Sequence, residues 1–114
     1  MRLMRFLDKE DKKIKYCTVE NKSNFLIDGD IFSNYKITNE KANISKILSP
    51  IIPKSILCIG LNYKKHAAEG NDKIPEYPIL FMKLANSIQN PEDPIIIPKY
   101  LESEAVDYEC ELAV

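Results

Sequence analysis

Apolar and polar residues alternate most regularly in the last eight positions of the chain, 107–114. Glu109 and Glu111 share one parity. Four other residues share the opposite parity: Tyr108, Cys110, Leu112 and Val114. Because successive side chains of a β-strand point to opposite faces, this pattern predicts a half-buried strand that begins near residue 106. The two carboxylates would project from one face of that strand, about 6.6 Å apart.

The beginning of the chain has the pattern of short strands joined by polar turns. Apolar-rich runs at residues 2–7 and 14–19 flank the charged stretch 8–13, and together they predict a β-hairpin. Residues 25–27 predict another short strand, which ends in a turn at 28–30.

A boundary follows near residue 50. Residues 33–43 are polar and predict a loop, whereas the apolar piece 44–48 is compatible with a helix or a strand. Pro50 and Pro53 then favour an extended linker. We therefore expect a small N-terminal β domain at residues 1–49 and a second unit at residues 50–114.

The second unit has a different pattern. The continuous apolar run 56–59 predicts a strand buried on both faces. Asn62 is a suitable N-cap for a two-turn helix at 63–69, which Gly70 would end at the C′ position. Downstream we expect a strand at 79–83, a loop at 84–93 and a short strand at 94–98. The predicted fold class is mainly β (α+β).

Composition narrows the function classes. The chain has 114 residues, 45% of them hydrophobic and 29% charged, which suits one domain or one small domain plus part of a second. A formal net charge of −1 gives no reason to expect nucleic acid or an anionic membrane as a partner. There is neither an apolar run long enough to span a bilayer nor a signal peptide, so we expect a cytoplasmic protein.

Cysteine usage agrees with a reducing compartment. Cys17, Cys58 and Cys110 are widely spaced, and no Cys-x-x-Cys pair is present. We interpret them as core cysteines rather than as a disulfide framework or a zinc site.

Two pairs of residues could carry chemistry. Glu109 and Glu111 could bind one hard divalent cation, although a solvated strand face would look the same. His66, the only histidine, lies three residues before Glu69 on the predicted helix. The carboxylate could orient the imidazole as a general base, although a surface ion pair has the same spacing.

Three motifs resemble those of the fumarylacetoacetate hydrolase family. The run 56–69 contains Gly-Leu-Asn-Tyr followed by His-x-x-Glu, residues 78–83 are similar to a Pro-x-x-Phe-x-Lys strand, and residues 107–114 read Asp-Tyr-Glu-Cys-Glu-Leu-Ala-Val. They occur in the family's order and spacing. Residues 1–48 resemble the small N-terminal β domain of many bacterial members, so the resemblance covers the whole chain.

The resemblance implies roles for five residues. Glu109 and Glu111 would be two of three acidic ligands to Mg²⁺ or Mn²⁺, and His66 with Glu69 would activate water. Lys83 would lie near the substrate carboxylate, although a solvated lysine at a strand end is an equal alternative. Leu84 departs from the proline that many members have there.

The expected function follows from this resemblance. The chain would be the first part of a mixed β-roll enzyme that acts on acylpyruvate or other 2-keto acids by C–C bond hydrolysis, decarboxylation or isomerisation. Complete members are usually homodimers. Because residue 114 closes an apolar strand with no turn after it, we expect a truncated fragment that is inactive alone. The alternative is a non-catalytic remnant that acts as a structural or binding module.

Overall fold

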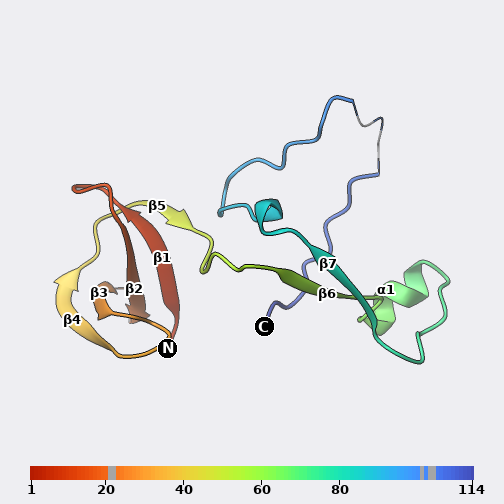
Figure 1. Cartoon of the computed structure of the whole chain (residues 1–114), viewed down its shortest axis with the longest axis horizontal. Helices are drawn as coiled ribbons and strands as arrows, with labels where there is room; N and C mark the ends of the chain where they lie inside the picture. Colours follow the sequence, from red (N-terminus) through yellow and green to blue (C-terminus); the bar gives the residue numbers. More distant parts are fainter. Residues whose placement is uncertain (21–22, 101, 103–104) are drawn as a thin grey trace.

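The computed structural model describes residues 1–20, 23–100, 102 and 105–114. Two antiparallel sheets dominate it (Figure 1), and the predicted mainly β class is confirmed. The first sheet has the strand order β4-β3-β2-β1-β5. Its strands are β1 (Leu3–Asp8), β2 (Ile14–Glu20), β3 (Ser23–Gly29), β4 (Tyr35–Lys41) and β5 (Ile44–Leu48).

The predicted hairpin forms the centre of this sheet. β1 pairs with β2 from Leu3↔Thr18 to Leu7↔Ile14. Phe6, Cys17 and Thr18 lie at 0% exposure, so the most completely buried side chains of the described residues belong to these two strands. The short apolar piece 44–48 is extended and pairs with the other edge of β1.

The predicted loop at 33–43 is wrong, because most of it forms β4. This strand is antiparallel to β3, and all of its side chains except Thr38 are exposed. Its backbone hydrogen bonds to β3 therefore hold it in place, and an edge strand of this kind needs no apolar alternation.

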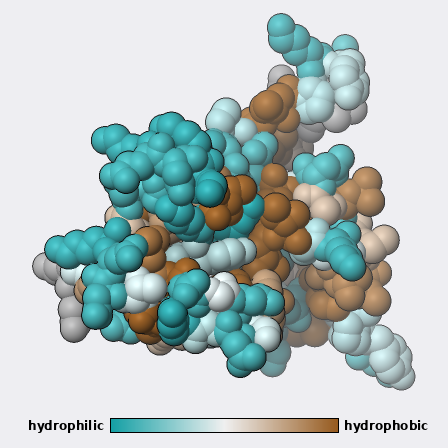
Figure 2. Space-filling view, turned by 60° about the vertical axis from the view of Figure 1, so that its left-hand side comes forward, coloured by the Kyte–Doolittle hydropathy of each residue, from teal (hydrophilic) through white to brown (hydrophobic). Residues whose placement is uncertain are grey.

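The second sheet is a two-stranded ribbon of β6 (Ile56–Gly60) and β7 (Ile79–Lys83). The expectation that β6 is buried on both faces is wrong, because β7 is its one partner strand among the described residues and Leu57 is 68% exposed. Leu57 lies opposite Met82 in the register, and Met82 is 61% exposed. Hydrophobic surface is visible between hydrophilic regions in Figure 2.

A short helix, α1 (Lys64–Glu69), connects these two strands. It begins one residue later than predicted, and its N-cap is Tyr63 rather than Asn62. Gly70 caps the other end in a right-handed conformation, whereas Asn71 adopts the left-handed one with φ 56°. Asparagine tolerates this conformation better than most residues, so the helix ends without a left-handed glycine.

After β7 the chain contains one turn of 3-10 helix, η1 (Ala85–Ser87), and then extended loops. The strands predicted at 94–98 and from 106 to 114 do not form. A strand requires a neighbour that accepts and donates backbone hydrogen bonds, and neither segment has one in the described part of the chain. In residues 1–20, 23–100, 102 and 105–114, no helix is long and apolar enough to cross a membrane.

Candidate active site

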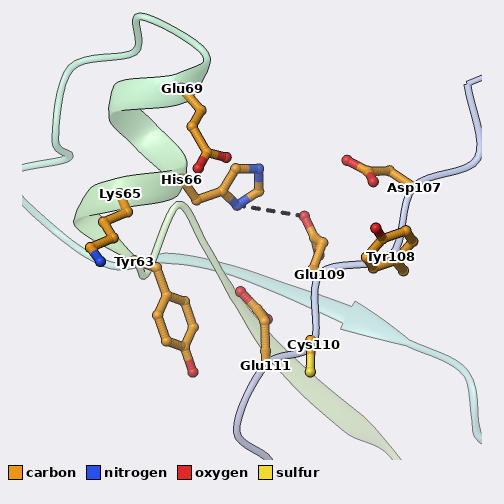
Figure 3. A pocket seen from close by; sticks show the side chains of 9 residues that line it. All are labelled: Tyr63, Lys65, His66, Glu69, Asp107, Tyr108, Glu109, Cys110 and Glu111. Atoms are coloured by element: carbon orange, nitrogen blue, oxygen red, sulfur yellow. Dashed lines mark ion pairs between the residues drawn. The ribbon is translucent and has the colours of Figure 1, made fainter.

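Residues 107–111 return to the beginning of α1, and a cavity of about 400 Å³ lies between the two segments. Its lining is shown in Figure 3 and comprises Tyr63, Lys65, His66, Glu69, Asp107, Tyr108, Glu109, Cys110 and Glu111. Four of the five residues that the sequence singled out are therefore brought together, from positions about forty residues apart.

His66 and Glu109 form an ion pair that joins the two segments across the cavity. The Nδ1 atom of His66 lies 3.8 Å from the Oε1 atom of Glu109. The side chains are 39% and 46% exposed, so water reaches both groups. An ion pair with this exposure contributes little to stability, and its interest lies in the placement of an imidazole beside a carboxylate.

Glu69 projects from the same short helix as His66, one turn further on (Figure 3). The spacing of three residues places both on the cavity side of α1, as expected. Within the described residues, the ion pair of His66 is with Glu109 and not with Glu69. The His66–Glu69 dyad therefore stays a prediction.

Glu109 and Glu111 reach the cavity without the predicted strand. Cys110 between them adopts φ 51°, a left-handed conformation that bends the chain and breaks regular strand alternation. Both carboxylates still lie on the side of the segment that faces α1 (Figure 3).

The acidic character of the cavity suits a cation. Its lining contains four carboxylates, compared with one lysine and one histidine. Carboxylate oxygens are the ligands that Mg²⁺ and Mn²⁺ prefer, so the chemistry of the donors fits such an ion. Within the part of the chain described here, however, no group of three or more His, Cys, Asp or Glu side chains is arranged to hold a metal. The described residues supply suitable ligands but not a complete set.

Lys83 lies outside this cavity. It ends β7 with its side chain exposed, and its Nζ atom lies 5.9 Å from the centre of the Phe81 ring. A cation beside an aromatic ring is weakly favourable at an exposed position. This geometry is that of the solvated lysine at a strand end, and the structure does not bring Lys83 to the other four residues.

Tyr63 is the residue that sequence reasoning missed. Its phenol oxygen accepts a hydrogen bond from the backbone N–H of Leu112 at 2.9 Å. The sequence contains Tyr63 within a recognised motif, but nothing in the alternation or spacing indicates a contact 49 positions away.

Comparisons with known proteins match both parts of the chain to family models. The family model described as "Fumarylacetoacetate (FAA) hydrolase C-terminal" matches residues 55–114. A second model, described as "Rv2993c-like, N-terminal", matches residues 1–47. The chain is also similar to the structure of an uncharacterized protein from Mycobacterium abscessus, with a TM-score of 0.57 and 27% identity. That match covers 76% of this chain and 34% of the other.

Two relatives indicate the range of similar proteins. The fumarylacetoacetate hydrolase domain-containing protein 2 homolog of Dictyostelium discoideum is 44% identical over all 114 residues, which cover 33% of that protein. A Xenopus laevis protein named oxaloacetate tautomerase fahd2, mitochondrial, is 51% identical over 74 residues, which are 64% of this chain and 22% of that protein. The chain thus spans a third or less of the length of these curated relatives.

Proposed function

The chain belongs to the fumarylacetoacetate hydrolase family, and we propose that it supplies the acid–base and metal-binding residues of an enzyme that acts on 2-keto acids. The observation that carries this proposal is the cavity where His66 lies 3.8 Å from Glu109, with Glu69 and Glu111 in the same lining. Oxaloacetate, the substrate in the name of the Xenopus relative, belongs to this substrate class.

Glu109 and Glu111 are the residues proposed to hold Mg²⁺ or Mn²⁺. When bound, such an ion polarises the oxygens of a keto acid and stabilises the negative charge that develops on them. Because divalent affinity rises with the number of charged ligands, two carboxylates from this chain would bind weakly by themselves.

His66 is proposed as the general base. A neutral imidazole can take a proton from a water molecule, for hydrolysis, or from the carbon next to a carbonyl, for tautomerisation. Glu109 lies at the Nδ1 side of the ring and can hold the protonated imidazole, while Glu69 carries a second carboxylate on the same helix. Lys83 does not line the cavity, so we assign it no step.

The test is a chimera in which these 114 residues replace the matching third of the Dictyostelium relative. The parent protein, assayed in parallel, shows which reaction to follow: oxaloacetate tautomerisation, oxaloacetate decarboxylation or acylpyruvate hydrolysis. We expect the chimera to catalyse the same reaction with added Mg²⁺ or Mn²⁺ and to lose it with EDTA. His66→Ala should lower turnover by roughly 10²–10⁴-fold.

Controls make this result specific. Glu109→Gln should raise the metal concentration that the chimera requires, whereas Glu76→Gln, at an exposed position outside the cavity, should not. The 114-residue chain alone should show little turnover, because its described residues do not complete a ligand set. A folded chimera that lacks the parent's activity would instead favour the alternative, a non-catalytic remnant with a structural or binding role.

A further inference from the structure

Tyr63 accepts one hydrogen bond within α1 and another from the segment that carries the glutamates. Its backbone carbonyl accepts the N–H of Ala67 at 3.1 Å, which closes the first turn of the helix. Its side-chain Oη accepts the N–H of Leu112 at 2.9 Å. One residue therefore joins the helix that carries His66 to the backbone directly after Glu111.

Few polar contacts among the described residues join positions 107–114 to α1. Residues 105–114 belong to no helix or strand. Two polar contacts join residues 107–114 to the α1 region in the described chain: the Leu112–Tyr63 hydrogen bond and the His66–Glu109 ion pair. The ion pair is half exposed and longer than a hydrogen bond, so it constrains the backbone weakly.

We propose that Tyr63 is a positioning residue whose hydroxyl holds the segment of Glu109 and Glu111 against α1, beside His66. The hydrogen bond at Leu112 fixes the backbone next to Glu111 and two positions after the left-handed Cys110. The functional part of this inference rests on the function proposed above, because Glu109 and Glu111 are assumed there to bind the cation.

The aromatic ring of Tyr63 could matter for packing at the beginning of α1 even without its hydroxyl. The test must therefore remove the hydroxyl and keep the ring. Tyr63→Phe keeps the ring and the backbone carbonyl that begins α1, and removes the single atom that contacts Leu112. Tyr77→Phe is the matched control, since Tyr77 is 75% exposed and does not line the cavity.

Three measurements on the 114-residue chain are required. The first is the hydrogen-exchange rate of the Leu112 amide, by NMR. The second is the nuclear Overhauser effect between the His66 ring and the Glu109 side chain. The third is Mn²⁺ affinity, from the broadening of signals near Glu109 and Glu111.

One hydrogen bond changes an equilibrium constant by a factor of roughly two to ten. Tyr63→Phe should therefore raise the exchange rate of the Leu112 amide and weaken Mn²⁺ binding by about that factor. The Overhauser effect should weaken, while Tyr77→Phe changes none of the three.

Other results would overturn either the role of Tyr63 or the proposed metal site. Unchanged exchange at Leu112 in Tyr63→Phe would overturn the proposal, as would faster exchange with both the Overhauser effect and Mn²⁺ affinity unchanged. If the unmodified chain binds no Mn²⁺ near Glu109 and Glu111, the proposed metal site fails, and the Overhauser effect alone decides whether Tyr63 positions the segment. Far-UV circular dichroism should show the same helix content in all three proteins.

Discussion

Three fully buried residues of the N-terminal sheet show how individual side chains shape its stability. Phe6, Cys17 and Thr18 are all at 0% exposure. Burial raises the pKa of the Cys17 thiol, so it stays protonated at neutral pH and is a poor nucleophile. Thr18 differs, because its Oγ1 atom is buried without a hydrogen-bond partner among the described residues.

Thr18→Val should therefore stabilise the chain. Valine has nearly the same shape, and the change removes a buried hydroxyl whose unsatisfied state costs about 1–3 kcal/mol. We expect the free energy of unfolding in urea to rise by about 1 kcal/mol. Thr38→Val is the control, because the Thr38 hydroxyl accepts the Glu40 N–H at 3.2 Å and its loss should be neutral or destabilising. A lower stability in Thr18→Val would mean that the hydroxyl has a partner in solution.

At the scale of helices and strands, the sequence predicted the elements whose residues carry a local signal of their structure. The hairpin of β1 and β2 combines apolar strands with a polar turn, and both signals are local. β4 was missed because backbone pairing with β3 maintains it. The strand at 106–114 was predicted from regular alternation, but alternation cannot supply a neighbouring strand. Local spacing pairs His66 with Glu69 and Glu109 with Glu111, whereas the approach of the two pairs was expected from the resemblance of the motifs and not from their spacing.

The turn after β1 should make the hairpin sensitive to acid. The Asp8 carboxylate accepts the Glu10 N–H at 2.9 Å and the Lys15 ammonium at 3.1 Å. The Glu10 N–H, and then Lys15, lower the pKa of Asp8 below its usual 3.8. A lowered pKa contributes stability that is complete above the unfolded-state pKa and is lost as the pH falls through the folded-state value.

Asp8→Asn should test this effect in urea unfolding curves between about pH 2 and pH 7. We expect lower stability at neutral pH and a smaller loss of stability on acidification than in the unmodified chain. Some acid sensitivity should persist, because the pKa values of Asp11 and Asp93 are lowered as well. Asp28→Asn, which removes an exposed ion pair with Lys36, should change stability at neutral pH by less than about 1 kcal/mol. An unchanged pH profile in Asp8→Asn would contradict the assignment.

At the scale of the whole molecule, the described residues form two sheets that share no strand pairing (Figure 1). Polar contacts join the region of β5 to the loop that follows η1: Lys46 forms an ion pair with Asp93, and the Ser49 N–H donates to the Asn90 side chain at 3.0 Å. The division into domains at residues 1–49 and 50–114 stays a prediction. If it is correct, damage to the core of one sheet should not spread to the other.

Phe6→Ala is the variant that decides this question. Deleting a fully buried phenylalanine costs about 3–5 kcal/mol, enough to unfold a small sheet. NMR should then show the amides of β1 to β5 exchanging rapidly, while the chemical shifts of β6, β7 and α1 keep their positions. Phe32→Ala, at a 76% exposed side chain in a turn, should leave both regions unchanged. Loss of the β6–β7 signals together with those of β1 would show that the contacts of Lys46 and Ser49 couple the two sheets into one cooperative unit. In that case the N-terminal sheet would also influence the cavity at α1, and mutations in its core would alter metal binding without touching a ligand.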